Sequence, residues 1–417
     1  MRNVFDQYAQ NENRLTHALA CTLVEDPRLL RGFVRWATGT DAPQRRLYVT
    51  EQTFPGEPEP AEGEAEKLGI PDAWIYTDNG WTLLIETKVQ ADLRREQLMR
   101  HVATAKRRGF LNPRLLALTA KRETLVSKYG VITRRWDELY RWLAKQRVRS
   151  DWARKLMTFL EVSERKFVAS EYLWEGALTV FSGIPFSADE PYSYLEAKRL
   201  LRLMTDELRK RRRLVRTLSM DPKGAGRGAI TGSQGTSVWD FLPLKISGRL
   251  DRFTNAPHLT ISIQQARLSV AVIIPNALAG SMRRQLASLD FESFRELMRV
   301  VTSNLAKVAN ARNGAQPCVE VLQRHYPALR ASPIVDARLE FDPRTAFPSR
   351  GRIKHQPEWL RAAHAAFSKR RANTQLMIGM LFPYGPGKTS SRPEIIDDIE
   401  EVWLGCKPLI DAMLKRK

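Results

Sequence analysis

Two predicted strands and the turn between them form the stretch GIPDAWIYTDNGWTLLIETKVQ, residues 69–90. Within these largely apolar runs, Asp72 directly follows a proline, and Glu86 and Lys88 stand two residues apart. Alternate residues of a strand share a face, so Glu86 and Lys88 are expected to point the same way and Thr87 the other. The stretch therefore predicts a hairpin with an acid and a lysine side by side.

The length of the turn determines whether Asp72 joins them. A two-residue turn over 79–80 would pair Asp72 with Thr87 and would put the acid on the wrong face. A three-residue loop over 78–80 pairs Asp72 with Glu86, and loops of this type end naturally on a glycine in the left-handed conformation. We predict the three-residue loop, which gathers both acids and the lysine into one cluster.

Such a cluster favours a metal site. Two adjacent carboxylates repel each other, and burying them is costly unless a cation neutralises them. Mg²⁺ keeps several waters and takes its other ligands from one or two carboxylates and a substrate phosphate. The metal lowers the pKa of a bound water, and a lysine beside it can orient that water or neutralise developing negative charge. We therefore predict a phosphodiester-cleaving site for Mg²⁺, or Mn²⁺ in its place.

The charge of the chain indicates its partner. The 417 residues include 67 basic and 46 acidic side chains, a net charge of +21. This excess suits a polyphosphate, because neutralising phosphates releases condensed counterions. Solubility alone needs less charge, and no basic amphipathic helix with an aromatic face points to a membrane surface. The predicted partner is DNA, with RNA as the alternative and no membrane partner.

Cysteine usage and hydropathy indicate the compartment. Cys21, Cys318 and Cys406 are odd in number and far apart, which argues against a disulfide framework. No segment is apolar enough to span a membrane, and the N-terminus lacks the apolar stretch of a secretory signal. These features predict a reducing, cytoplasmic location.

The chain is too long for one ordinary core, and we expect two domains. In residues 1–168, the alternation of helices and strands predicts an α/β fold, a mixed sheet with helices on both faces. The expected elements are two helices over 6–37 broken near 26–27, a strand over 45–54, the hairpin, a helix over 91–109, a strand over 114–120 and a strand that turns helical over 131–146. Residues 171–417 predict an α+β domain.

The order of these elements and the pattern Pro71-Asp72, then Glu86-Thr87-Lys88, resemble the PD-(D/E)XK, or restriction-endonuclease-like, nuclease superfamily. The resemblance covers roughly residues 1–168 and implies a restriction-endonuclease-like core. It also implies that Asp72 and Glu86 bind the divalent metal and that Lys88 assists catalysis.

Two further positions follow from the resemblance. Some branches place a glutamine on the next helix, where this chain has Gln97, so the resemblance adds Gln97 to the catalytic residues. Those branches continue Q-x-x-x-Y, whereas this chain has His101 where the tyrosine would be. Several members supply an acid from the first helix, for which Glu12 is the candidate metal ligand.

The second domain has no catalytic motif that we recognise, but it carries a strong basic run. A long helix predicted over 193–218 contains Arg209, Lys210, Arg211, Arg212 and Arg213, which we expect to contact nucleic-acid phosphates. An antiparallel hairpin over 258–275, a strand over 374–382 and a closing helix over 393–415 are also expected. The roles predicted for this domain are nucleic-acid binding, sensing or oligomerisation.

An acidic segment precedes the hairpin; its acids are Glu57, Glu59, Glu62, Glu64 and Glu66. The simpler interpretation is a solvated loop, and the alternative is a mimic of DNA charge that screens the site.

Taken together, the residues and the resemblance predict a Mg²⁺-dependent deoxyribonuclease. The resemblance suggests a bacterial restriction or anti-phage defence effector that acts as a homo-oligomer or with a defence-complex partner. The alternatives are a non-cleaving nucleic-acid-binding subunit of a larger complex and an RNA or tRNA endonuclease.

Overall fold

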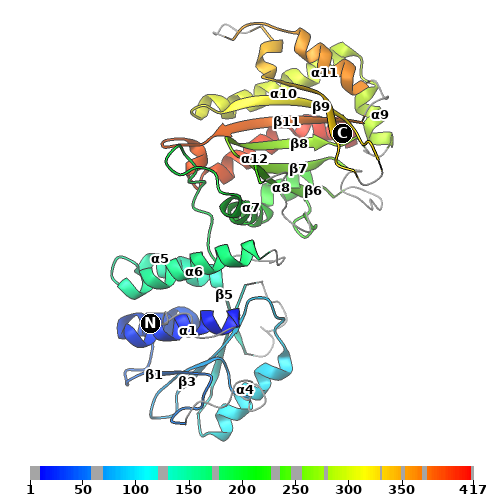
Figure 1. Cartoon of the computed structure of the whole chain (residues 1–417). Helices are drawn as coiled ribbons and strands as arrows, with labels where there is room; N and C mark the ends of the chain where they lie inside the picture. Colours follow the sequence, from blue (N-terminus) through cyan, green and yellow to red (C-terminus); the bar gives the residue numbers. More distant parts are fainter. Residues whose placement is uncertain are drawn as a thin grey trace. The chain divides into compact units, whose positions relative to one another are not determined.

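The protein divides into two compact units, Met1–Val180 and Phe181–Lys417 (Figure 1). The computed structural model describes residues 10–57, 69–120, 130–170, 178–226, 235–245, 256–276, 280–328, 331–348, 353–368 and 373–414. None of the helices in these ranges has a stretch long and apolar enough to cross a lipid bilayer. The roles predicted for the two parts of the chain stay predictions.

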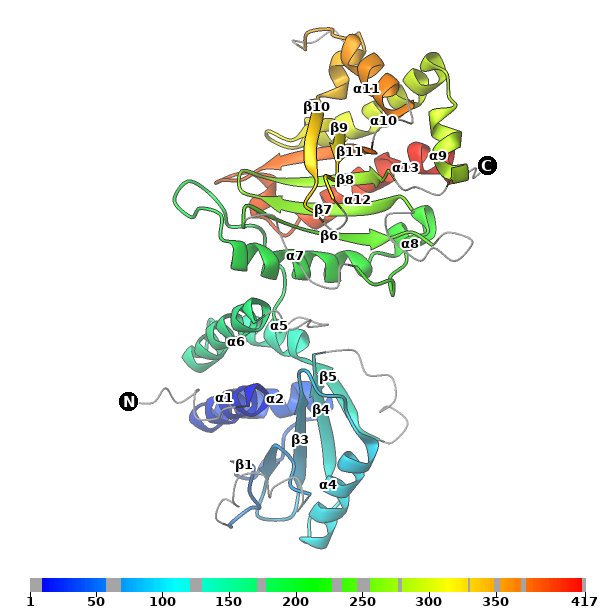
Figure 2. The ribbon, with the colours of Figure 1, turned by 45° about the vertical axis from the view of Figure 1, so that its right-hand side comes forward.

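The first unit contains a five-stranded mixed sheet in the order β1-β2-β3-β4-β5 (Figure 2). The pairs β1–β2 and β2–β3 are antiparallel, and the pairs β3–β4 and β4–β5 are parallel. Its elements are α1 (Asn11–Glu25), α2 (Pro27–Thr38), β1 (Tyr48–Glu51), β2 (Ala73–Tyr76), β3 (Thr82–Lys88), α4 (Arg95–Arg107), β4 (Arg114–Thr119), β5 (Ile132–Arg135), α5 (Trp136–Gln146) and α6 (Asp151–Ala169). The predicted mixed α/β architecture is confirmed.

The hairpin between β2 and β3 has the predicted register. Ala73 pairs with Ile85, so the preceding residue, Asp72, lies level with Glu86. The loop closes on Gly80, whose φ of 86° is the left-handed conformation that this loop type requires. The turn therefore places both acids at the same end of the sheet.

Helices cover both faces of this sheet, and the two faces differ. Side chains of α1, α2, α5 and α6 form the larger core against one face, around residues such as Phe33 and Trp136. The other face packs against α4 through a smaller cluster that includes Trp74, Leu84 and Leu98. Because side chains alternate along β3, Glu86 lies on the same face as Leu84, toward α4.

We expect a fragment ending at Val180 to fold alone, because both cores of the first unit are built from its own side chains. It should show a single cooperative urea transition by circular dichroism. A fragment ending at Arg149 is the matched control, since it lacks α6 and the core residues Leu156 and Leu160. Non-cooperative unfolding of the longer fragment would show that the first unit depends on the second.

The second unit contains a six-stranded antiparallel sheet in the order β10-β9-β11-β8-β7-β6. Its elements are α7 (Tyr194–Arg209), α8 (Arg212–Leu218), β6 (Ser237–Pro243), β7 (His258–Gln264), β8 (Arg267–Ile274), α9 (Gly280–Ala287), α10 (Phe291–Ala311), β9 (Gln316–His325), β10 (Ile334–Phe341), α11 (Glu358–Ser368), β11 (Asn373–Pro383), α12 (Ile395–Gly405) and α13 (Lys407–Leu414). An α+β unit is confirmed, including the hairpin expected over 258–275.

β11 lies in the middle of this sheet, between β9 and β8. It joins the hairpin β9–β10 to the meander β6–β7–β8. At Gly379 the strands approach so closely that a Cβ atom would lie 1.9 Å from the carbonyl oxygen of Val270. Only glycine fits there without moving the backbone.

The single helix predicted over 193–218 is wrong. α7 ends at Arg209, and α8 begins at Arg212 after the extended residue Arg211 (φ −74°, ψ 102°). Like charges three or four residues apart destabilise a helix, and the basic run concentrates them at this point. The closing helix predicted over 393–415 is likewise two helices, α12 and α13.

Candidate active site

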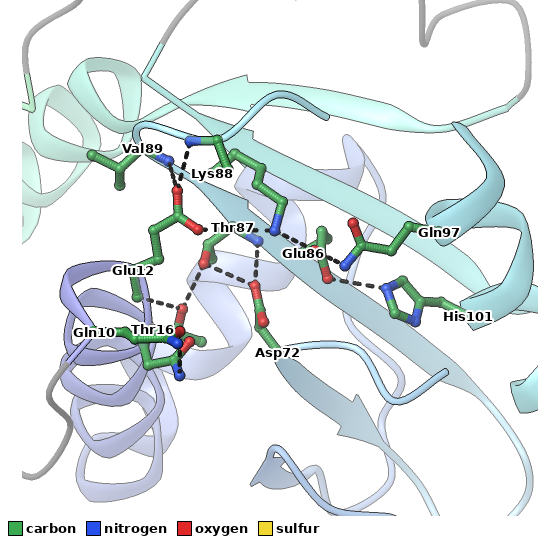
Figure 3. Close-up of polar contacts among 12 residues, drawn as sticks. Gln10, Glu12, Thr16, Asp72, Glu86, Thr87, Lys88, Val89, Gln97 and His101 are labelled. Carbon is green, nitrogen blue, oxygen red and sulfur yellow. Dashed lines mark hydrogen bonds and ion pairs between the residues drawn. The ribbon is translucent and has the colours of Figure 1, made fainter. Parts of the chain in front are cut away.

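The carboxylate of Glu86 is at the centre of the candidate site and is fully buried. Its Oε1 accepts a hydrogen bond from Gln97 Nε2 at 2.8 Å and lies 2.8 Å from Lys88 Nζ. Its Oε2 lies 3.1 Å from Nε2 of His101 (Figure 3). One strand and one helix therefore direct three nitrogen groups onto a single carboxylate.

These contacts set the charge states of Glu86 and Lys88. Burial by itself favours a neutral Glu86, but the contacts from His101 and Lys88 outweigh it, and the pKa of Glu86 is lowered. Burial also opposes the charge of Lys88, yet the carboxylates of Glu86 and Asp72 raise its pKa. Lys88 is therefore an ammonium at neutral pH, able to neutralise negative charge but not to accept a proton.

Asp72 directly precedes β2 and is level with Glu86, and its carboxylate contacts Thr87. Its Oδ2 accepts hydrogen bonds from the backbone N–H of Thr87 at 2.7 Å and from the Thr87 hydroxyl at 2.9 Å. The Thr87 hydroxyl also lies 2.6 Å from the hydroxyl of Thr16 on α1. Burial and the neighbouring charge of Glu86 raise the pKa of Asp72 to about 7. Asp72 is thus a constrained acid whose ionisation is costly beside Glu86.

Glu12 lies near the cluster but supports the backbone. Its Oε1 accepts hydrogen bonds from the N–H groups of Val89, Gln90 and Ala91 at 2.8, 3.0 and 3.2 Å. Its Oε2 is 3.9 Å from Lys88 Nζ. Within the described part of the chain, no three or more His, Cys, Asp and Glu side chains are arranged to hold a metal ion. The structure does not bring Glu12 together with the two acids of the hairpin as a third ligand.

Replacing Glu12 by alanine should destabilise the fold more than it weakens metal binding. It removes an acceptor shared by three backbone N–H groups, which should cost about 1–3 kcal/mol in the free energy of unfolding. Urea unfolding measures this cost, with Glu25→Ala at the exposed end of α1 as the control. A tenfold loss of Mg²⁺ affinity in the folded variant, by calorimetry, would instead identify Glu12 as a ligand.

His101, which stands where the resemblance would place a tyrosine, is part of the site. Its Nδ1 lies 2.9 Å from the carbonyl oxygen of Gly69, and its Nε2 faces Glu86. Burial lowers the pKa of His101, but the Glu86 carboxylate raises it more, so the ring can carry a proton on both nitrogens. The signals in the sequence were its spacing of four residues from Gln97, on one face of α4, and its place at the tyrosine of the Q-x-x-x-Y pattern.

Through His101, α4 contacts both Glu86 on β3 and the segment that precedes Asp72. Gly69 has a φ of 71° and packs so closely on α4 that a Cβ atom would lie 2.9 Å from Cγ of Arg100 and 3.0 Å from Oγ1 of Thr104. This contact positions the chain three residues before Asp72. A tyrosine at position 101 would offer one hydroxyl, whereas the imidazole contacts Gly69 and Glu86 with separate atoms.

A divalent cation fits the chemistry of this cluster. Oε2 of Glu86 is buried, and its neighbour among the described residues is Nε2 of His101 at 3.1 Å. The raised pKa of Asp72 reflects the cost of burying this acid and, second, of the neighbouring Glu86 carboxylate. A cation would relieve that repulsion, and Mg²⁺ needs only one or two protein carboxylates. Asp72 and Glu86 are the residues that would hold it.

The basic run of the second unit binds to acids of the same unit. Arg211 lies 2.7 Å from Asp397 on α12, and Arg213 forms an ion pair with Glu401. The rest of the run includes Lys210, which lies 2.7 Å from Glu207, Arg209, which donates to the carbonyl oxygen of Gly224, and the exposed Arg212. Three of its five residues are therefore paired with acids, which leaves less charge for the predicted phosphate binding.

The acidic segment is described only at its start. Glu57 forms an ion pair with Arg108, directly after α4. The other acids, Glu59, Glu62, Glu64 and Glu66, lie outside the described residues.

Comparison of this chain with protein-family models gives no match, and comparison with curated protein sequences gives none either.

Proposed function

We propose that the first unit is a Mg²⁺-dependent nuclease with a restriction-endonuclease-like core, which hydrolyses phosphodiester bonds of DNA. The supporting observation is the register of the hairpin, which aligns Asp72 with Glu86 and leaves the Lys88 ammonium 2.8 Å from Glu86. The order of an antiparallel hairpin followed by two parallel strands agrees with the resemblance found in the sequence.

Each residue of the cluster has a distinct part in the proposed reaction. When bound, Mg²⁺ would activate water and withdraw negative charge from the phosphate. Asp72 and Glu86 would hold the ion. Lys88 neutralises the charge that develops on the phosphate oxygens in the transition state. Gln97 and His101 keep the Glu86 carboxylate in one orientation, so that little reorganisation is needed during the reaction.

The direct test is digestion of supercoiled plasmid with Mg²⁺, with Mn²⁺ and with a chelator. We expect nicking or linearisation only with metal, and its loss in Glu86→Ala and Lys88→Ala. Parallel digests of single-stranded DNA and tRNA separate a deoxyribonuclease from an RNA or tRNA endonuclease. If the protein binds DNA but cuts none of these substrates, the alternative of a non-cleaving subunit is favoured.

For the second unit we propose nucleic-acid binding, sensing of an activating signal or oligomerisation, as part of a cytoplasmic restriction or anti-phage effector. The charge of the chain supports a polyanionic partner. Gel-filtration mass with and without DNA distinguishes a self-associating effector from a monomer that requires a separate defence-complex partner.

A further inference from the structure

α4 has two sides with different chemistry. Its inner side carries the buried residues Leu98, His101 and Ala105, together with Gln97, which contacts Glu86. The remaining surface of the helix and its flanking residues is mostly basic, although Asp92 and Glu96 are exposed there too; the exposed basic side chains are Arg94, Arg95, Arg100, Lys106, Arg107 and Arg108. The helix whose Gln97 and His101 contact Glu86 therefore also presents positive charge to solvent.

Three of these cations lack the local acid that balances exposed arginines elsewhere. On α10, Arg295 lies 3.2 Å from Glu292, and Arg299 lies 2.6 Å from Glu296. Neither Arg94, Lys106 nor Arg107 has an acid three or four residues away in the sequence. The contact described for Arg107 is a neutral one, to the hydroxyl of Thr104 at 2.9 Å. Cations without a local acid among the described residues are suited to bind a polyanion.

The position of α4 relates this charge to the site. Arg94 is the N-cap residue of α4, in extended backbone, and Gln97 lies three residues later in the first turn of the helix. At a rise of about 1.5 Å per residue, the segment from Arg94 to Arg107 is about 20 Å long. Successive phosphates along one strand of a duplex are separated by about 3.4 Å along its axis, so this length corresponds to about six base pairs.

We propose that the cationic side of α4 binds the sugar–phosphate backbone of the substrate, with Arg94 next to the reacting phosphate and Lys106 and Arg107 several nucleotides away. The order of these contacts along the nucleic-acid strand, with Arg94 at the reacting phosphate, rests on the proposed nuclease function. The binding surface itself can be measured without cleavage. Contacts of this kind carry no base information, so α4 contributes affinity and alignment but no sequence preference.

The test compares two double charge reversals in the full chain. Arg94→Glu with Lys106→Glu alters α4. Lys155→Glu with Lys166→Glu makes the same change in net charge on α6, where both lysines are exposed and the helix packs on the opposite face of the sheet. Anisotropy of a fluorescent duplex of about 24 base pairs, with a chelator present, gives the dissociation constant between about 50 and 200 mM salt.

We expect the α4 double variant to lose at least about tenfold in affinity at the lower salt and to reduce the salt slope by about two, roughly 0.9 per lost phosphate contact. The α6 double variant should keep the wild-type slope. An equal loss in both would mean that net charge matters and location does not, which would overturn the proposal. An unchanged α4 variant would overturn it as well.

Two further arms keep the result unambiguous. If circular dichroism shows that a charge-reversal variant is unfolded, the α4 variant is replaced by Arg94→Gln with Lys106→Gln, which makes half the change in charge. The same titrations with an RNA duplex show whether DNA or RNA is the preferred source of the phosphate backbone. Loss of binding in the α4 variant, combined with a wild-type protein that cuts nothing, would sink the nuclease function and leave α4 as a binding surface.

Discussion

Asp72→Asn is expected to abolish cleavage and to make the folded protein more stable at neutral pH. The substitution keeps the shape of the side chain but removes one of the two carboxylates that would hold the metal, and we expect a loss in rate of at least about 10³-fold. The same change relieves the repulsion between positions 72 and 86, which, with burial, raises the pKa of Asp72 to about 7. Activity and stability should therefore move in opposite directions.

The raised pKa of Asp72 determines how its contribution to stability changes with pH. An unperturbed aspartate titrates near 3.8, whereas Asp72 in the folded chain titrates near 7. Between these values the folded state binds more protons than the unfolded state, so the contribution of Asp72 to stability falls as the pH rises from about 4 to about 7 and is level above. Glu86, whose pKa is lowered, acts in the opposite sense below about pH 4.5, its ordinary pKa.

Thermal melts of wild type and Asp72→Asn across this range, with a chelator present, measure the effect. The curves should diverge as the pH rises toward 7, with the asparagine variant more stable. Asp78→Asn, an exposed aspartate in the loop of the same hairpin, should change neither stability nor cleavage. Plasmid cleavage by Asp72→Asn at the wild-type rate would show that the proposed site is wrong.

Lys88→Met should separate catalysis from metal binding. Methionine keeps much of the aliphatic stem but removes the ammonium, which lies 2.8 Å from Glu86 Oε1 and would neutralise charge on the reacting phosphate. We expect single-turnover cleavage to fall by about 10²–10³-fold, the range seen when one electrostatic group is removed from a transition state. Mg²⁺ affinity should be kept or increased, because Glu86 loses a competing cation.

Calorimetric titration with Mg²⁺ and quenched-flow cleavage measure the two quantities on the same preparation. Lys145→Met, on the exposed side of α5, is the matched control and should be neutral in both. A parallel loss of metal affinity and rate would show that Lys88 is needed to form the metal site, which would contradict a direct role in the reaction.

The hairpin was the most predictable part of the fold, because its register depends on local rules. Alternation assigns the faces, and Gly80 favours the three-residue loop, so the alignment of Asp72 with Glu86 follows without knowledge of the rest of the chain. Gln97, which contacts Glu86, was indicated by the resemblance, which places a glutamine on the helix after the hairpin.

Contacts between distant segments were not predictable in this way. Arg211 and its partner Asp397 are separated by almost half of the chain, so the sequence shows a basic run without the acids that neutralise it. Glu12 has an acid's chemistry, but only the packing of α1 on β3 reveals that it binds three backbone N–H groups. Local patterns carry no information on such tertiary partners.

The central position of β11 affects how the second unit folds during synthesis on the ribosome. Domains fold as they are synthesised, from the N-terminus onward, but residues 373–383 emerge after the other five strands of this sheet. Until then, β8 and β9 each lack the neighbour that they share in the finished sheet. The nascent second unit therefore carries two open strand edges, which can pair with other chains. A chain that stops before residue 373 keeps both edges, and we expect it to need chaperones and to aggregate, whatever the state of the first unit.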